Sequence, residues 1–99
     1  MRQLLALIAL ASLAGCGPIQ STSALIDADV ELEAARSAGA GATAPYEFTS
    51  AEAYLHKARE LAGGAQYEAS SDFASRAADH AKAARKKAIE ASNKAGEAP

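Results

Sequence analysis

The sequence is poor in the residue types that catalytic and metal sites usually require. Its 99 residues contain one cysteine, two histidines, three tyrosines, two phenylalanines and no tryptophan. The single cysteine has no partner for a disulfide within the chain, and His56 and His80 lack the spacing of a zinc-binding pair. The sequence therefore predicts no metal site and no catalytic residues, and it favours a protein that is not an enzyme.

A strong charge of one sign is also lacking, because ten basic residues nearly balance twelve acidic ones. Nucleic-acid binding requires a basic footprint, so nucleic acid is not expected as a partner. Large apolar residues are scarce after Cys16, where Leu, Ile, Val and Phe together number ten. We expect a weakly cored fold with no enclosed pocket and no small-molecule substrate.

No apolar stretch approaches the roughly 20 residues that a membrane-spanning helix needs. The longest, LLALIALASL over residues 4–13, follows Arg2 and the free amino terminus. A short basic region followed by a short apolar region is typical of a secretory signal peptide. We assign residues 1–15 to such a signal.

The stretch Leu13-Ala14-Gly15-Cys16 resembles the lipobox of bacterial lipoproteins. The resemblance implies cleavage between Gly15 and Cys16, a diacylglycerol on the Cys16 sulfur and an acyl chain on the new amino terminus. No other cofactor is expected. Gly17 stands where an aspartate would favour retention in the inner membrane, so the resemblance implies the periplasmic side of the outer membrane. The alternative is a secreted protein cut near residues 9–11, which would leave a free thiol in an oxidising compartment.

Beyond Cys16 the sequence predicts an all-α fold without strands. Residues 16–23 are expected to form a polar, lipidated tether whose Ser21, Thr22 and Ser23 can cap the first helix. Apolar residues recur at helical spacing over about 24–38, on a stripe of Leu25, Ala28, Leu32 and Ala35 that is widened by Ile26 and Val30.

Two further helices are expected to form an Ala-rich antiparallel hairpin. Residues 39–45 contain glycine and proline and predict a loop. The capping box Thr49-x-x-Glu52 places the start of the next helix near Ser50, and Gly63-Gly64 ends it near residue 62. A last helix is expected over about 66–95, with a disordered tail over 96–99. Its heptad seam consists of Tyr67, Ser70, Ala74, Ala77, Ala81, Ala84, Ala88, Ala91 and Ala95.

The helix before the last one carries a matching seam of Ala51, Tyr54, Ala58 and Leu61. Coiled-coil-like packing of the two seams pairs Leu61 with Ser70 and Tyr54 with Ala77, and it leaves the end of the last helix uncovered. The helical domain is assigned to residues 24–95. Within it, the helix over 24–38 can lie alongside the helix over 50–62, or end to end with it over the exposed end. The acidic first helix and the basic last one favour the end-to-end arrangement, but exposed ion pairs contribute only about 0–1 kcal/mol each. The charges are equally compatible with solvated faces, so both arrangements stay open.

The five aromatic residues lie in the middle third of the sequence. They can form the hydrophobic centre of the fold, or they can form a partner-binding patch, since aromatic residues are favoured at interaction hot spots. As candidate partner-binding residues we name Tyr46, Phe48, Tyr54, Tyr67 and Phe73.

Three stretches resemble the central segment of the bacterial envelope lipoproteins grouped as domain of unknown function 4398. They are Pro45–Thr49, Ala53–Glu60 and Ala65–Ala69. The lipobox and the basic, Ala-rich last helix also fit this family. The resemblance implies a helical fold and an envelope location, and it carries over no functional residue beyond Cys16.

These features predict a lipid-anchored interaction or scaffold protein of the bacterial envelope. Its partners would be the membrane, through the anchor, and a protein or a second copy of the chain. The alternative is a structural, oligomeric coiled-coil lipoprotein that contacts peptidoglycan non-covalently.

Overall fold

The chain is an elongated assembly of helices, 76 × 22 × 14 Å along its principal axes. The computed structural model describes residues 1–9 and 17–96 in full. The element order is α1 (Arg2–Ser37), α2 (Ala40–Thr43), α3 (Pro45–Gly63) and α4 (Tyr67–Glu97), and the described residues contain no strand. The predicted all-α class and the predicted helical hairpin are therefore confirmed.

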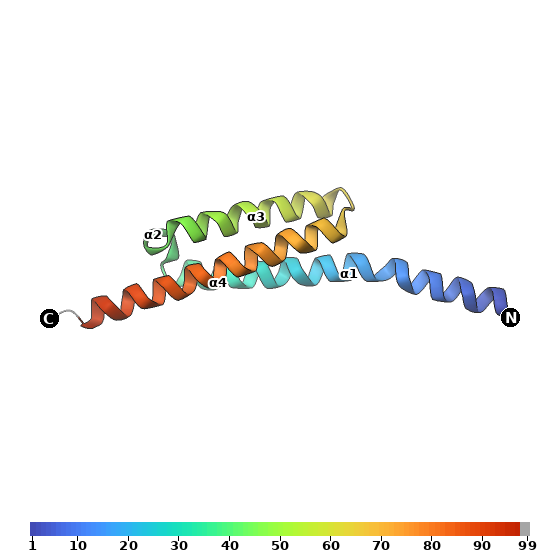
Figure 1. The fold of residues 1–99 in the computed structure, drawn as a ribbon, viewed down its shortest axis with the longest axis horizontal. Coiled ribbons are helices and arrows are strands. Elements are labelled where there is room, and N and C mark those ends of the chain that lie inside the picture. The colour runs from blue at the N-terminus through green and yellow to red at the C-terminus, as the bar shows by residue number, and fades with distance from the viewer. Residues whose placement is uncertain (98–99) are drawn as a thin grey trace.

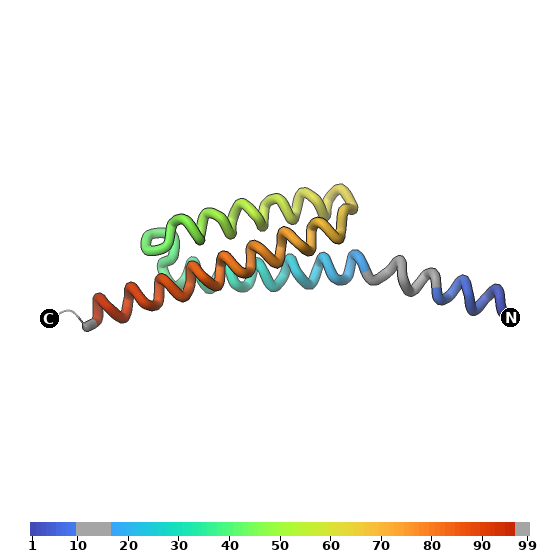
Figure 2. Tube along the Cα trace, in the orientation of Figure 1, coloured from blue at the N-terminus to red at the C-terminus, as the bar shows by residue number. Residues whose placement is uncertain are grey.

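Three of these helices form a bundle, with α3 antiparallel to α4 and α1 running parallel to α4 (Figure 1). The beginning of α1 projects from one end of the bundle and the end of α4 projects from the other, as the tube in Figure 2 also shows. Helix α1 thus lies alongside α3 and α4, and the end-to-end arrangement that charge weakly favoured is wrong.

Charge does not discriminate between the two possible positions of α1, because an ion pair also forms when α1 lies alongside α3. Asp29 pairs with Arg59 of α3 at 2.9 Å. The alanines near the end of α1 and after it cover only the first part of the α4 segment expected to be exposed, since Ala35, Ala40 and Ala44 pack against Ala84 and Ala88.

Alanine makes up most of the core. The larger cluster joins all three long helices and contains only two large aliphatic residues, Leu32 and Leu55. Small side chains allow helix backbones to approach closely, so many dispersion contacts replace the bulk of larger residues. The other members of this cluster are Ala28, Ala51, Ala58, Ala74, Ala77, Ala78 and Ala81.

The start of the first packed helix differs from the prediction. Residues 17–23 already belong to α1, and Ser21 is buried in the bundle and does not cap a helix at residue 24. Ser21 Oγ donates a hydrogen bond of 2.9 Å to Ser70 Oγ, and Ser70 Oγ donates one of 2.8 Å to the Ala58 carbonyl oxygen. Because the Ser21 hydroxyl finds a partner on α4, it is not needed as a cap. At the other end, Gly96 is still part of α4, while residues 98–99 lie outside the described residues.

The connection between α1 and α3 is shorter than predicted. Gly39, at φ 83°, ends α1 in a left-handed conformation, and the single turn α2 follows. Helix α3 begins at Pro45, five residues before the predicted start, so the expected capping box lies inside the helix. Proline is favoured at the first helical position because its φ is preset and its missing N–H would have no partner there.

In the turn between α3 and α4, the position with a left-handed backbone conformation is occupied by an alanine and not by a glycine. The N–H of Gln66 donates to the Leu61 carbonyl and the N–H of Ala65 to the Ala62 carbonyl, which is the pattern of a Schellman C-cap. The left-handed residue of this motif is Ala65, at φ 61°, although glycines precede it at 63 and 64. The hairpin therefore turns where the sequence predicted.

Candidate functional site

The structure does not gather the five predicted aromatic residues into one patch. Tyr54 and Phe73 meet at the centre of the α3/α4 hairpin, with a ring separation of 5.9 Å. His80 stacks on the other side of Tyr54, at 5.2 Å between centroids and 10° between planes. Tyr54 thus sits between residues 73 and 80, which agrees with its predicted level beside Ala77.

Phe48 and Tyr46 lie in the first turn of α3. Phe48 is partly buried against both core clusters, and the Arg36 guanidinium lies 5.6 Å from its ring centroid. Tyr46 is 72% exposed and lies outside both clusters. Of the five predicted residues, Tyr46 presents the most accessible ring to a partner.

Tyr67 is the first residue of α4 and lies beside Gly17, the residue that follows Cys16 in the sequence. A Cβ atom at Gly17 would lie 3.7 Å from the Cβ of Tyr67, so α1 and α4 are in contact immediately after the predicted lipidation residue. Four residues further along, Ser21 is hydrogen-bonded to Ser70. Gly15 and Cys16, the predicted cleavage and lipidation residues, lie outside the described residues.

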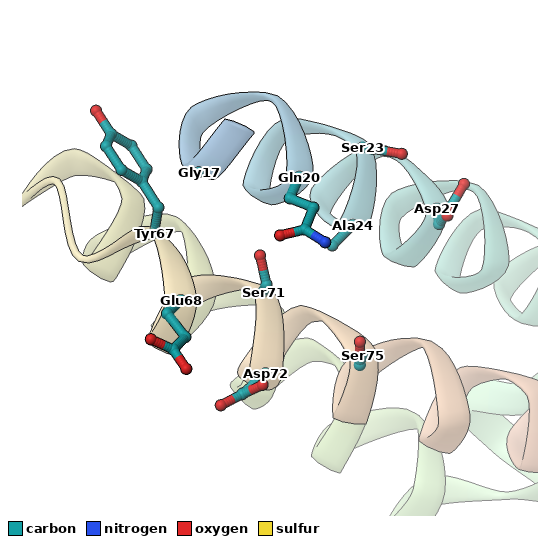
Figure 3. Close-up of a pocket in the computed structure, with 10 residues that line it drawn as sticks. All are labelled: Gly17, Gln20, Ser23, Ala24, Asp27, Tyr67, Glu68, Ser71, Asp72 and Ser75. Carbon is teal, nitrogen blue, oxygen red and sulfur yellow. The ribbon is translucent and has the colours of Figure 1, made fainter. Parts of the chain in front are cut away.

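A chain of open cavities follows the groove between α1 and α4. The first has a volume of about 560 Å³, and Gln20 and Ser71 point toward each other across it while three carboxylates lie at its rims (Figure 3). A second cavity shares Asp27 and Ser75 with the first, and a third shares Lys82 with the second. We call the residues that line these three cavities the α1/α4 face.

A line of exposed aliphatic residues borders this face on the outside of α1. Ile19, Ile26 and Val30 are 72%, 57% and 61% exposed. The prediction that Ile26 and Val30 widen the buried stripe is therefore wrong. At 100° per residue these two side chains point almost opposite to Ala28 and Ala35, which is the signal that could have placed them on the outside.

Titratable groups are mostly solvated and do not converge. No group of three metal-ligating side chains occurs among the described residues. His56 is exposed, and His80 is held against the Tyr54 ring. Glu47 is the exception, since its hydrogen bond to Lys87 lowers the pKa of its carboxyl below the usual value. This ion pair ties the start of α3 to α4.

Within the described residues no helix combines the length and apolar character needed to cross a bilayer. No protein-family model matches the sequence, and no curated protein and no solved structure is significantly similar to it.

Proposed function

We propose that this chain is a lipid-anchored, non-catalytic interaction or scaffold protein of the bacterial envelope. The anchor is a diacylglycerol on Cys16, and the location is the periplasmic side of the outer membrane. The observation that carries the proposal is the cysteine placed directly after two small residues and a short apolar stretch, in Leu13-Ala14-Gly15-Cys16.

The packing of the residues that follow Cys16 supports a role for the anchor in orienting the bundle. A Cβ atom at Gly17 would meet Tyr67, and Ser21 is hydrogen-bonded into the bundle. Acyl chains on Cys16 would therefore be attached one residue before a segment that packs in the bundle. Such a connection would let the membrane control where the faces of the bundle are presented.

The anchor is tested by mass spectrometry of the chain recovered from its own host. We expect residues 1–15 to be absent and Cys16 to carry the added mass of a diacylglycerol and an acyl chain. A Cys16→Ser variant is the matched control and should be released from the membrane fraction. A bare thiol at position 16 in the host protein would overturn the proposal.

The outer-membrane location is tested separately at Gly17. A side chain there makes only ordinary contact with Tyr67, so Gly17→Asp should leave the fold intact. We expect Gly17→Asp to shift the protein to the inner membrane and Gly17→Ala, the matched control, to leave its location unchanged. Recovery of the wild type and of the Gly17→Ala variant in the inner membrane would refute the outer-membrane assignment.

One observation favours the alternative role, in which an oligomer contacts peptidoglycan. The end of α4 projects beyond α1 and α3 and carries Lys94 (Figure 1). Co-sedimentation of the protein with purified peptidoglycan, and its loss in a Lys94→Glu variant, would support this role.

A further inference from the structure

The α1/α4 face carries opposite charges at its two ends. Around the first cavity lie three acidic residues and no basic one, namely Asp27, Glu68 and Asp72. Around the third cavity lie Lys82, Arg85 and Lys86, against the two carboxylates Glu31 and Glu90. Asp79, which lines the second cavity, lies between these two ends. The face therefore changes from strongly negative at the first cavity to weakly positive at the third.

These charges are available to a partner. The three acidic and three basic residues are all exposed. The ion pairs found within the described part of the chain involve other residues and leave all six out. An exposed charge gradient along one face is suited to a surface with the reverse gradient.

We propose that the α1/α4 face binds a second copy of this chain in an antiparallel homodimer, the acidic end of each copy facing the basic end of the other. A two-fold axis across the face reverses the direction of the second copy, so one charge gradient complements itself. A parallel pair would place like charges opposite each other and is disfavoured for that reason.

Helix geometry gives the register of this pair. Ala78 lies midway between the acidic and basic groups, and residues at equal distances from a two-fold axis come level with each other. With the axis near Ala78, Lys86 of the second copy comes level with residue 70, between Glu68 and Asp72. Ile89 of the second copy, which is 44% exposed, comes level with Tyr67 and gains an apolar neighbour.

The size of the face fits a modest interface. From Tyr67 to Ile89 it extends about 33 Å at 1.5 Å per residue, and two adjacent helices are roughly 20 Å wide. The resulting area of roughly 650 Å² is close to the ~800 Å² per partner of a standard interface. The exposed residue nearest its centre is Asp79, and Lys82, one turn further along α4, brings the opposite charge close to the two-fold axis.

The inference deepens the proposed function and rests on it only in treating the bundle as an interaction module. It has one consequence for the anchor. In an antiparallel pair the two Cys16 residues lie at opposite ends, so a dimer with both anchors in one bilayer lies along the membrane and does not stand upright on it.

The test exchanges the charges of each end in the full chain, kept in a mild nonionic detergent. One variant carries Lys82→Glu, Arg85→Glu and Lys86→Glu, and the other carries Asp27→Lys, Glu68→Lys and Asp72→Lys. We expect sedimentation equilibrium to show a wild-type dimer that weakens with salt, and each variant alone to dissociate at least about tenfold more readily. An equimolar mixture of the two variants should associate one to one, because an all-acidic face then meets a predominantly basic one.

A matched control exchanges an ion pair on the outside of α3, through Lys57→Glu with Glu60→Lys, and should dimerise like the wild type. Circular dichroism checks that all variants keep their helix content. A monomeric wild type would overturn the proposal, as would a variant that dimerises normally or a mixture that fails to associate. The readout does not depend on lipidation, so failure here leaves the assignment of Cys16 untouched, and a bare Cys16 leaves the charge exchange untouched.

Discussion

The two faces of α1 reverse the usual arrangement, in which large apolar side chains are buried and polar ones are exposed. The inner face buries Ser21, Ala28 and Ala35 at 0–2% exposure, whereas the outer face leaves Ile19 and Ile26 more than half exposed. Size accounts for the difference. Two serine side chains joined at 2.9 Å show how closely α1 and α4 approach, and a β-branched side chain between them would force the backbones apart.

This comparison teaches that close approach, and not apolar area, selects the residues of this core. Alanine buries little surface, so its free-energy gain per residue from the hydrophobic effect is small. It also loses no side-chain entropy on burial, and it has the highest helix propensity. A core of this kind is sensitive to added volume and depends strongly on its few large residues. Four substitutions test these statements, in order of expected effect.

Leu55→Ala should cause the largest loss of stability. Among the described residues Leu55 is the largest fully buried side chain, and it belongs to the core cluster that joins α1, α3 and α4. Removing it leaves a cavity among alanines that cannot fill it, so we expect a loss of about 2–5 kcal/mol in the free energy of unfolding. Urea denaturation followed by circular dichroism measures this value. A loss below about 1 kcal/mol would show that the core does not depend on its large residues.

Ala28→Leu tests whether close approach is required, and it should destabilise by about 1–3 kcal/mol although it adds apolar surface. Ala28 is 1% exposed on the inner face of α1. The matched control is Ile26→Leu on the outer face, which should change stability very little. A more stable Ala28→Leu protein would contradict the role assigned to small residues.

Ser21→Ala tests the polar contact that fastens the start of the bundle. The substitution removes the donor to Ser70 Oγ, while Ser70 keeps its bond to the Ala58 carbonyl. We expect a loss of about 0.5–1.5 kcal/mol, together with faster amide hydrogen exchange over residues 17–23. Thr22→Ala is the control, because Thr22 is exposed and bonds only within α1. Unchanged exchange over 17–23 would mean that this hydrogen bond does not hold the segment.

Ile26→Ser should have the smallest effect on stability. The side chain is 57% exposed, so its loss should lie within about 0.5 kcal/mol of zero. If the apolar outer face contributes to a contact between copies or with a membrane, the variant will change sedimentation or membrane partition without changing the urea midpoint. A large loss of stability would show that this side chain is buried in solution.

Local signals in the sequence were sufficient for some features and misleading for others. The glycine pair predicted the hairpin turn, and the alanine seam predicted every residue of α4 that is buried from Ser70 to Ala88 except Ala78. The sequence predicts a loop at Pro45, whereas the structure uses this proline as the first residue of α3. The serines before residue 24 fit the pattern of helix caps, because a hydroxyl near a helix start usually bonds to its own backbone, but Ser21 bonds to α4 instead.

The candidate site was less predictable than the fold. The aromatic residues are close in sequence, yet they divide among the middle and the two ends of the bundle. The α1/α4 face could not be found from the sequence, because it exists only when residues about 50 positions apart lie side by side, as Ser21 and Ser70 do.

The sequence by itself determined that the described chain is helical and that the chain reverses after Gly63. Helix propensity, alanine periodicity and glycine act over a few residues, so they can be recognised without a fold. Only the tertiary structure decided that α1 lies alongside the hairpin, that its aliphatic residues face outward, and that acidic and basic groups share one face. These outcomes depend on how closely three backbones can pack, which is a property of all the small residues together.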